Sequence, residues 1–204
     1  MTKRVFLFLL LIFITALYCI KINKQTLDVV GEERFIKLDV DAKALAKFQG
    51  PWHCILDKKT GLTWENKTST ETIHDGYWSY SWYLDGKGTQ NRGDCYFEQS
   101  RCDVSDLIKR TNQENLCQRN NWRLPTVKEL NTLINHNALD GRATTYNDYF
   151  LQTQPSHYWT AETIKLSGFF AHLGQGAITI NFGSAQPDIL PFNQAAFVRL
   201  VSSH

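Results

Sequence analysis

The stretch from residue 117 to 134 constrains the fold more than any other part of the sequence. It contains Cys-Gln-Arg-Asn-Asn-Trp-Arg-Leu-Pro-Thr-Val-Lys-Glu-Leu-Asn-Thr-Leu-Ile, in which one helix is expected to end and another to begin. The loop between them carries Trp122, Leu124 and Pro125, and a loop with these apolar residues is expected to be buried. Because proline disfavours helical backbone in the residue before it, Leu124 should be extended.

A capping box marks the start of the second helix. Thr126 precedes Glu129 by three residues, just ahead of apolar residues at helical spacing, which predicts a helix over about 127–136. Arg123 is the one charged residue in the Trp-Arg-Leu-Pro-Thr junction. We interpret it as structural, with its guanidinium bound to loop carbonyls or to a carboxylate of the domain. The alternative interpretation is a ligand-binding arginine.

The N-terminal segment carries an export signal. Residues 5–20 are an almost purely apolar run behind Lys3 and Arg4, which is the pattern of a secretory signal. No small-x-small cleavage site follows, so residues 1–20 are either a signal peptide or an uncleaved signal anchor that contacts the membrane. Residues 21–32 are expected to be a tether to a domain over 33–204. This domain should be periplasmic, membrane-anchored or at the cell surface.

Export changes how the cysteines are interpreted. Cys54, Cys95, Cys102 and Cys117 form an even set in an oxidising compartment, so two disulfides are expected. Four cysteines allow three pairings. Cys95 and Cys102 enclose a short local loop, which leaves Cys54 and Cys117 for a long-range bridge. Free or metal-bound thiols are the alternative, but zinc is not expected because no Cys-x-x-Cys is present.

Charge and composition exclude two classes of protein. The net charge is +2, and Lys3 and Arg4 contribute both charges in a segment without acidic residues. The remaining chain is therefore neutral, which gives no electrostatic basis for binding nucleic acid. Aromatic residues make up 13% of the chain, and disordered chains contain few of them.

Residue patterns predict a mixed fold. A helix over 104–117 is expected behind an N-cap at Asp103. Residues 163–195 should contain strands separated by loops. The predicted class is α+β with two helices and a largely antiparallel sheet. Further short strands are expected at 35–40, 52–56, 62–65, 77–83, 157–161 and 196–201, with Gly61 in the turn between the second and third.

The sequence lacks the motifs of common enzymes. The six histidines show no pair at i, i+4 and no His-Glu-x-x-His, and no Gly-x-Ser-x-Gly, phosphate-binding loop or dinucleotide fingerprint occurs. We therefore expect no catalytic residues, no metal site and no cofactor. The tripeptide Arg92-Gly93-Asp94 lies between the cysteines of the domain, and we interpret it as ordinary loop sequence.

The candidate ligand contacts are polar residues of the 163–195 region, because loops on a rigid scaffold commonly carry recognition. They are Asn181, Gln186, Asp188 and Asn193. Calcium is an alternative ligand for oxygen-bearing side chains of this kind. These residues are scattered along the sequence, however.

The order of motifs resembles that of the Lcl C-terminal domain family, named for a collagen-like bacterial adhesin. The resemblance covers residues 33–201 and rests most strongly on Thr-Gly-Leu-Thr-Trp-Glu, which contains Trp64, and on Trp-Arg-Leu-Pro-Thr-Val-Lys-Glu-Leu. The other matching segments are 34–39, 52–54, 78–83, 116–117, 148–150, 158–159 and 197–201. Two departures are the lack of a collagen-like repeat and the low aromatic content of 163–195.

The resemblance implies a disulfide-stapled, C-type-lectin-like fold related to the formylglycine-generating enzymes. It also implies a bacterial envelope or surface domain, some members of which are adhesins for sulfated polysaccharides or host surfaces. The expected function is a non-catalytic binding module for a carbohydrate or an envelope or surface protein. The alternative is a structural component of a surface organelle or envelope complex.

Overall fold

The computed structural model describes residues 33–95, 101–138 and 141–203. The expected signal segment 1–20 and tether 21–32 lie outside these residues. One compact unit begins at Phe35 and continues to the end of the chain. Within the described part of the chain, no helix is both long enough and apolar enough to cross a bilayer.

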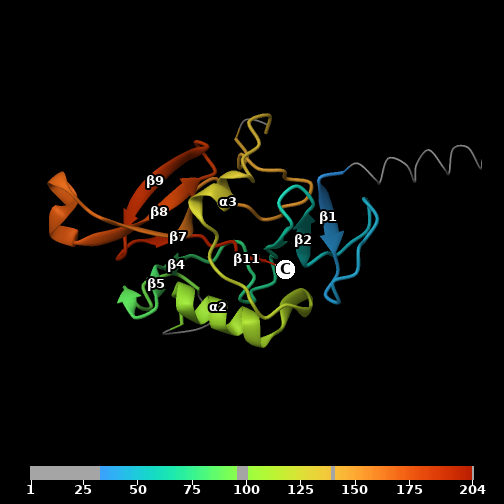
Figure 1. Cartoon of the computed structure of the whole chain (residues 1–204), viewed down its shortest axis with the longest axis horizontal. Coiled ribbons are helices and arrows are strands. Elements are labelled where there is room, and N and C mark those ends of the chain that lie inside the picture. The colour runs from blue at the N-terminus through green and yellow to red at the C-terminus, as the bar shows by residue number, and fades with distance from the viewer. Residues whose placement is uncertain (1–32, 96–100, 139–140, 204) are drawn as a thin grey trace, which may run out of the picture. The chain divides into compact units, whose positions relative to one another are not determined.

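The N-terminal hairpin and the C-terminal strand form one antiparallel sheet at one end of the unit (Figure 1). Ile55 and Trp64 face each other across the hairpin and are fully buried. Gly61 closes the turn with φ of 71°, as the sequence predicts. In sheet order the strands are β1 (Phe35–Leu38), β2 (Cys54–Asp57), β3 (Leu62–Glu65) and β11 (Val201–Ser202).

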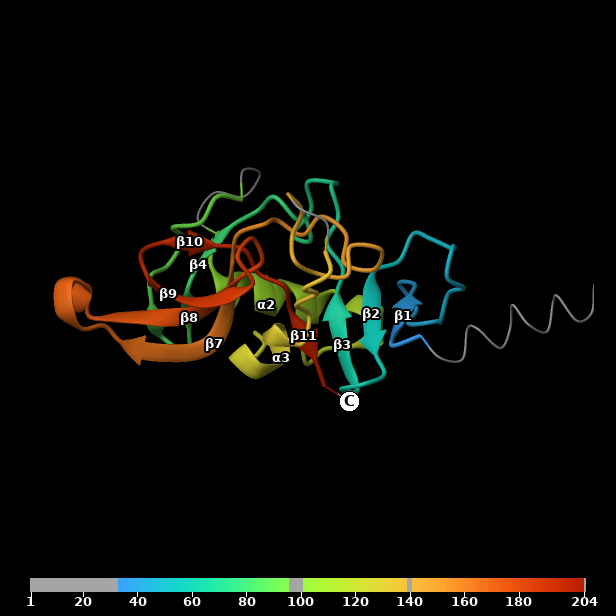
Figure 2. The ribbon, with the colours of Figure 1, turned by 90° about the horizontal axis from the view of Figure 1, so that it is seen from above.

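A second antiparallel sheet lies at the opposite end of the unit in both views (Figures 1 and 2). It consists of β7 (His157–Lys165), β8 (Gln175–Asn181) and β9 (Gln186–Pro191), in that order. Residues alternate between the two faces of a strand, so Tyr158 packs in one hydrophobic cluster and Trp159 in the other. The inner half of this sheet is therefore buried on both faces.

The predicted strands 77–83 and 196–201 are wrong in extent, because each is divided between two partners. Ser81 pairs with Ala195, whereas Tyr83 pairs with Gly88. Phe197 lies outside these pairs and forms an isolated bridge to Tyr158. The resulting two-stranded sheets are β4 (Tyr80–Ser81) with β10 (Ala195–Ala196), and β5 (Tyr83–Leu84) with β6 (Lys87–Gly88).

The first predicted helix begins as expected but is shorter. Helix α2 (Val104–Gln113) has Asp103 as its N-cap, whose side chain accepts from the Asp106 N–H at 3.0 Å. The prediction of helix to residue 117 is wrong, because Cys117 has φ of 49° in the separate turn η1 (Leu116–Gln118). Its disulfide and a bond from the Trp122 indole to the Leu116 carbonyl hold this turn outside the helix.

The second helix is also shorter than predicted. Helix α3 (Val127–Asn131) starts at the expected capping box, in which Thr126 and Glu129 exchange hydrogen bonds of 2.8 and 3.1 Å. The extension to residue 136 is wrong. The Thr132 hydroxyl donates to the Glu129 carbonyl at 2.7 Å. The Leu133 N–H donates to the Leu130 carbonyl, and not to the Glu129 carbonyl that it would bind in a continuing α-helix. A side-chain bond of this kind competes with the helical ladder.

Both expected disulfides are present. Cys54–Cys117 joins β2 to η1, and Cys95–Cys102 closes a local loop beside β4. The apolar loop before α3 is buried as predicted, with Trp122 and Leu124 at 2% and 1% exposure. The fold is therefore a mixed α+β domain with two α-helices among the described residues, antiparallel sheets and two disulfides.

Candidate functional site

Arg123 has a structural role, as the sequence predicts. Its guanidinium donates two hydrogen bonds to the Glu129 carboxylate, at 2.7 and 2.8 Å, and further bonds to the Leu124 carbonyl and the Ser203 hydroxyl. The bonds from Arg123 outweigh partial burial and lower the pKa of Glu129 to about 2. Arg123 is thus hydrogen-bonded within the domain, while its side chain remains 40% exposed.

The Arg92-Gly93-Asp94 tripeptide is built into the fold by its backbone. The Gly93 N–H donates to the Cys102 carbonyl, and Asp94 exchanges main-chain bonds with Ser79. A Cβ on Gly93 would lie 2.2 Å from the Ser79 oxygen. The glycine is therefore required by a close approach of backbone segments.

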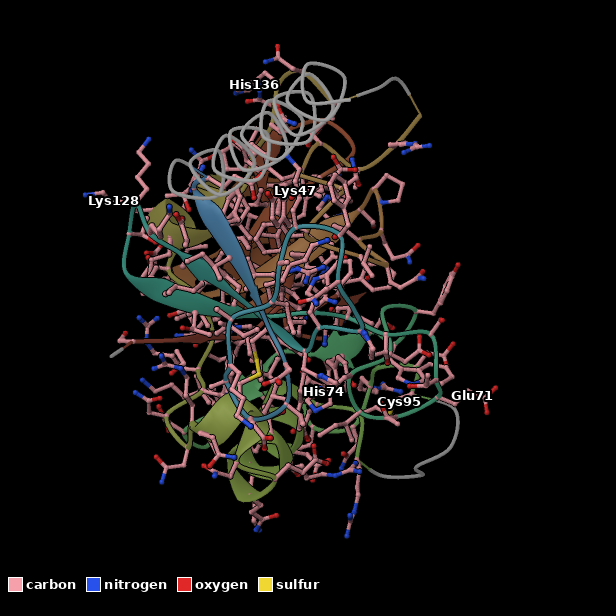
Figure 3. All side chains as sticks on the ribbon, turned by 90° about the vertical axis from the view of Figure 1, so that its right-hand side faces the viewer. Lys47, Glu71, His74, Cys95, Lys128 and His136 are labelled. Carbon is pink, nitrogen blue, oxygen red and sulfur yellow. A yellow bond between two sulfur atoms is a disulfide. The ribbon has the colours of Figure 1, made fainter. Side chains whose placement is uncertain are left out.

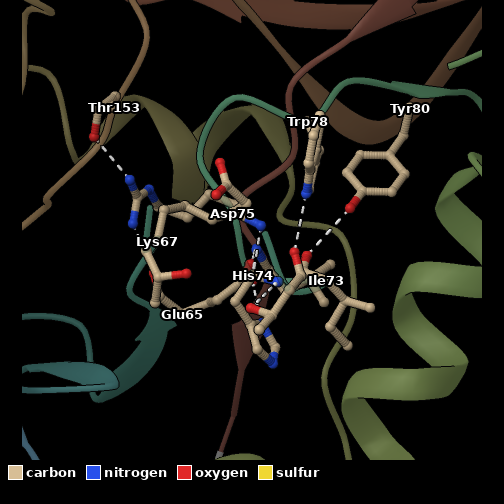
Figure 4. A network of polar contacts seen from close by, with 12 residues as sticks. Glu65, Lys67, Ile73, His74, Asp75, Trp78, Tyr80 and Thr153 are labelled. Carbon is tan, nitrogen blue, oxygen red and sulfur yellow. Dashed lines mark hydrogen bonds and ion pairs between the residues drawn. The ribbon is translucent and has the colours of Figure 1, made fainter. Parts of the chain in front are cut away.

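A buried charge network surrounds Glu65, the last residue of β3 (Figure 4). The Glu65 carboxylate is fully buried and binds both the Lys67 ammonium and the His74 ring at 2.7 Å. Burial raises the pKa of Glu65, but the charge of Lys67 and the bond from His74 outweigh it and lower this pKa to about 2. Glu65 is therefore an anion in the core at neutral pH.

His74 lies between two carboxylates. Its Nδ1 is 2.7 Å from Glu65, and its Nε2 is 3.0 Å from Glu114 at the C-terminal end of α2. Burial alone would lower the pKa of His74, but the bonds to Glu114 and Glu65 outweigh it and raise this pKa. The network thus ties α2 to β3 through the His74 ring.

A hollow of about 510 Å³ lies beside the β1–β2 loop, and we name it the Phe48 hollow. Phe48 is 94% exposed at its rim. Lys47 belongs to the same loop and is labelled in Figure 3, which faces the β1 end of the domain. The full lining consists of Lys37, Lys47, Phe48, Asn147, Asp148, Tyr149 and Leu151.

Aromatic rings and hydrogen bonds give the Phe48 hollow its shape. The Lys37 ammonium lies 3.7 Å from the ring centre of Trp52 and 5.5 Å from that of Tyr149, and it donates to the Lys47 carbonyl. The Trp52 indole donates to the Tyr149 carbonyl at 2.8 Å. A smaller polar depression of about 220 Å³ shares residues 147–149 and is also lined by Asn135, Asn137, Ala138, Arg142, Thr145 and Tyr146.

The second sheet carries a mainly aliphatic groove of about 520 Å³, named here the β9 groove. Ile164 and Ile189 are 39% and 43% exposed within it. Its other lining residues are Lys165, Leu166, Ser167, Leu173, Asp188, Leu190, Pro191 and Gln194.

The edge of β9 is closed to an added strand. Pro187 and Pro191 have no N–H, and the N–H of Ile189 donates to the Asp188 carboxylate at 2.7 Å. Alternate residues of an edge strand direct their main-chain groups the same way. These three positions of the β9 edge therefore offer no free N–H to an added strand.

The structure brings together three of the four predicted ligand contacts. Asn181 faces Gln186 across the β8–β9 turn, and His157 contacts both Asn181 and Asp188 at 3.2 and 3.1 Å. Asn181 also accepts from the Gly183 and Ser184 N–H groups, which is a turn-stabilising role. Asn193 lies apart, in the exposed turn after β9. Of these residues, only Asp188 lines the β9 groove.

Sequence reasoning did not identify the Phe48 hollow. Its residues come from two segments about 100 positions apart, so no local pattern marks them. The described residues contain no group of three or more His, Cys, Asp or Glu side chains placed to hold a metal ion.

Comparison with known proteins identifies one family. The family model for the Lcl C-terminal domain matches residues 53–202. No curated protein and no solved structure matches the chain. The family and the two disulfides indicate an exported, extracytoplasmic protein. Because the match covers most of the sequence, the chain belongs to the Lcl C-terminal domain family.

Proposed function

We propose that this protein is a non-catalytic binding module that recognises a carbohydrate at the bacterial envelope or surface, with the Phe48 hollow as its site. The scaffold that we infer is a C-type-lectin-like fold, related to that of the formylglycine-generating enzymes. Recognition in this proposal uses side chains alone and needs no cofactor or metal ion.

The observation that carries this proposal is the combination of groups around the Phe48 hollow. Phe48 supplies an exposed ring and Tyr149 a half-buried one, while Asp148 supplies an exposed carboxylate. Asn147 offers its amide oxygen, because its Nδ2 already donates to the Ala143 and Thr145 carbonyls. Rings provide apolar faces for stacking, and the polar groups can bind hydroxyls. The volume of about 510 Å³ is within the range of small-ligand sites.

The chemistry of the buried groups supports a non-catalytic module. Four of the five cysteines are joined in disulfides, and a disulfide sulfur is no nucleophile. Lys67 and His74 both contact the buried Glu65 carboxylate. They are therefore structural groups in this proposal, not acids or bases for a substrate.

A glycan array probed with the oxidised protein, at low and physiological salt, tests the proposal. Phe48→Ala should weaken binding of any retained glycan about five- to tenfold, as expected for a contact worth more than about 1 kcal/mol. Phe169→Ala is the matched control, because Phe169 is 85% exposed but lies outside the hollow. Failure to retain any glycan at either salt concentration, or equal effects of the two variants, would contradict the proposal.

The second candidate function is assembly with an envelope or surface protein through the β9 groove. Its aliphatic lining and its exposed Ile164 and Ile189 favour apolar side chains of a protein over a sugar. Peptides selected from a displayed library on the oxidised protein test it. They should lose affinity about tenfold on Ile189→Asp and keep it on Tyr77→Asp, since exposed Tyr77 is outside the groove. This function would be refuted if no selected peptide bound Ile189→Asp more weakly than Tyr77→Asp.

A further inference from the structure

The Phe48 hollow is joined to the buried charge network by a short series of hydrogen bonds. Asn66 follows Glu65 in the sequence, and its Oδ1 accepts from the Leu151 N–H at 3.1 Å. Its Nδ2 donates to the Trp52 carbonyl at 3.0 Å, and the Trp52 indole donates to Tyr149. Asn66 therefore holds the wall of the hollow on two sides.

Arg199 makes the second connection. It is buried, and its Nη1 donates to the Glu65 carbonyl at 2.7 Å. Its Nη2 donates to the Leu151 carbonyl at 3.2 Å and to the Thr153 hydroxyl at 2.7 Å (Figure 4). The N–H of Leu151, a wall residue of the hollow, is thus held by Asn66, and its carbonyl is held by Arg199, which also binds the Glu65 carbonyl.

His74 is one of three groups that hold the Glu65 carboxylate, with the Lys67 ammonium and the Leu200 N–H. A neutral imidazole has a single N–H, whereas both ring nitrogens of His74 face carboxylates at hydrogen-bond distance. This arrangement therefore requires the imidazolium. The charged groups around the ring come from β3 and the residues after it, α2, the loop of His74 and the C-terminal segment; they are Glu65, Lys67, Glu114, Arg110, Asp75 and Arg199.

We propose that the charged form of His74 positions the wall of the Phe48 hollow, so that ligand binding weakens as the pH rises and His74 loses its proton. On deprotonation the ring releases one proton to solvent and keeps one N–H; in the tautomer with that N–H on Nε2, the bond to Glu65 is the one lost. Glu65 then shifts with Asn66, and Leu151 follows. The inference rests on the proposed function of the hollow, and none of these positioning residues touches the ligand.

The direction of the pH effect follows from the surroundings of His74. Burial lowers the pKa of His74, but the bonds to Glu114 and Glu65 outweigh it, so the proton leaves above the ordinary value of 6.5. The hollow should accordingly be intact below pH 6.5 and lose its shape as the pH rises through the raised pKa of His74. Glu114→Gln removes one carboxylate charge at nearly constant volume, so it should move this transition to lower pH.

Nuclear magnetic resonance of the oxidised full chain tests the proposal without a ligand. A sample labelled with nitrogen-15 in leucine and in the histidine rings reports on Leu151 and His74 together. We expect both His74 ring nitrogens to carry protons at pH 6, and the Leu151 amide to shift with the same midpoint as His74. In Glu114→Gln both midpoints should fall together. In His74→Gln the pH dependence of Leu151 should disappear.

His157→Gln is the matched control, because His157 also contacts a carboxylate but belongs to the second sheet. It should leave the Leu151 titration unchanged. A neutral His74 at pH 6, or a Leu151 amide whose shift does not follow the titration of His74, would overturn the proposal. These signals do not depend on a carbohydrate, so an empty glycan array would refute the proposed function while leaving the positioning result to be decided separately.

Discussion

Removal of the Cys54–Cys117 disulfide should destabilise the domain about twice as much as removal of Cys95–Cys102. A disulfide stabilises a protein mainly by restricting its unfolded chain, and the effect grows with the length of the closed loop. The first bridge joins cysteines 63 positions apart and the second joins cysteines 7 apart. The loop-closure relation gives about 4 kcal/mol for the longer loop and about 2 kcal/mol for the shorter.

Paired alanine substitutions of each bridge, melted side by side in calorimetry, measure this difference. For a domain of this size each kcal/mol lowers the melting temperature by roughly 2–4 °C. The Cys54–Cys117 variant should therefore lose roughly 8–16 °C and the other roughly 4–8 °C. Because both sulfurs of the first bridge are fully buried, reduced wild-type protein, which keeps their volume, is the control for cavity effects.

The difference in loop length predicts a larger loss of stability for the Cys54–Cys117 variant than for the Cys95–Cys102 variant. Equal losses for the two paired variants, or a larger loss for Cys95–Cys102, would refute it. A loss that appears in the alanine pair but not in the reduced wild-type protein would assign the effect to packing of the sulfurs.

Three further predictions concern the charge network, the junction and the tripeptide. The folded-state pKa of His74 is raised, so its stabilising effect should be complete below pH 6.5 and disappear as the pH rises through the raised value; melting from pH 6 to 9 should show this fall in wild type and not in His74→Gln. The pKa of Glu129 is lowered to about 2, so its contribution should be present above pH 4.5 and fade toward pH 2; acid unfolding should show a smaller pH dependence in Glu129→Gln. Gly93→Ala should lower the melting temperature, because the new Cβ would meet the Ser79 backbone. Arg92→Ala should change the free energy of unfolding by no more than about 0.5 kcal/mol.

Local signals in the sequence were sufficient to predict the ends of elements that local chemistry determines. The turn at Gly61 needs positive φ. The capping box of Thr126 and Glu129 supplies hydrogen-bond partners for the N–H groups at the start of α3. The end of α2 is different. Asn115 and Cys117 adopt left-handed backbone because a disulfide and the Trp122 indole hold the turn outside the helix, and neither contact can be inferred from the helical pattern.

The candidate sites were harder to predict for a related reason. The predicted polar contacts Asn181 and Asp188 are occupied by turn and main-chain bonds, whereas the Phe48 hollow combines the β1–β2 loop with residues 147–151. Composition also gave no sign that Lys67 and Arg199 are buried. Their charges resemble surface charges until the tertiary structure shows the groups that bind them.

The buried charges have a consequence for the shape of the surface. A buried ion pair stabilises a fold little beyond what apolar residues would achieve, so Glu65, Lys67 and Arg199 need not be present for stability alone. Arg199 binds the main chain on both sides of the gap between β3 and the 151–153 segment, which an apolar side chain could not do. Recognition loops need a rigid support, and directional bonds from the core to Leu151 supply it for the wall of the Phe48 hollow. His74 makes that support dependent on a proton, because its two carboxylate partners require both of its N–H groups.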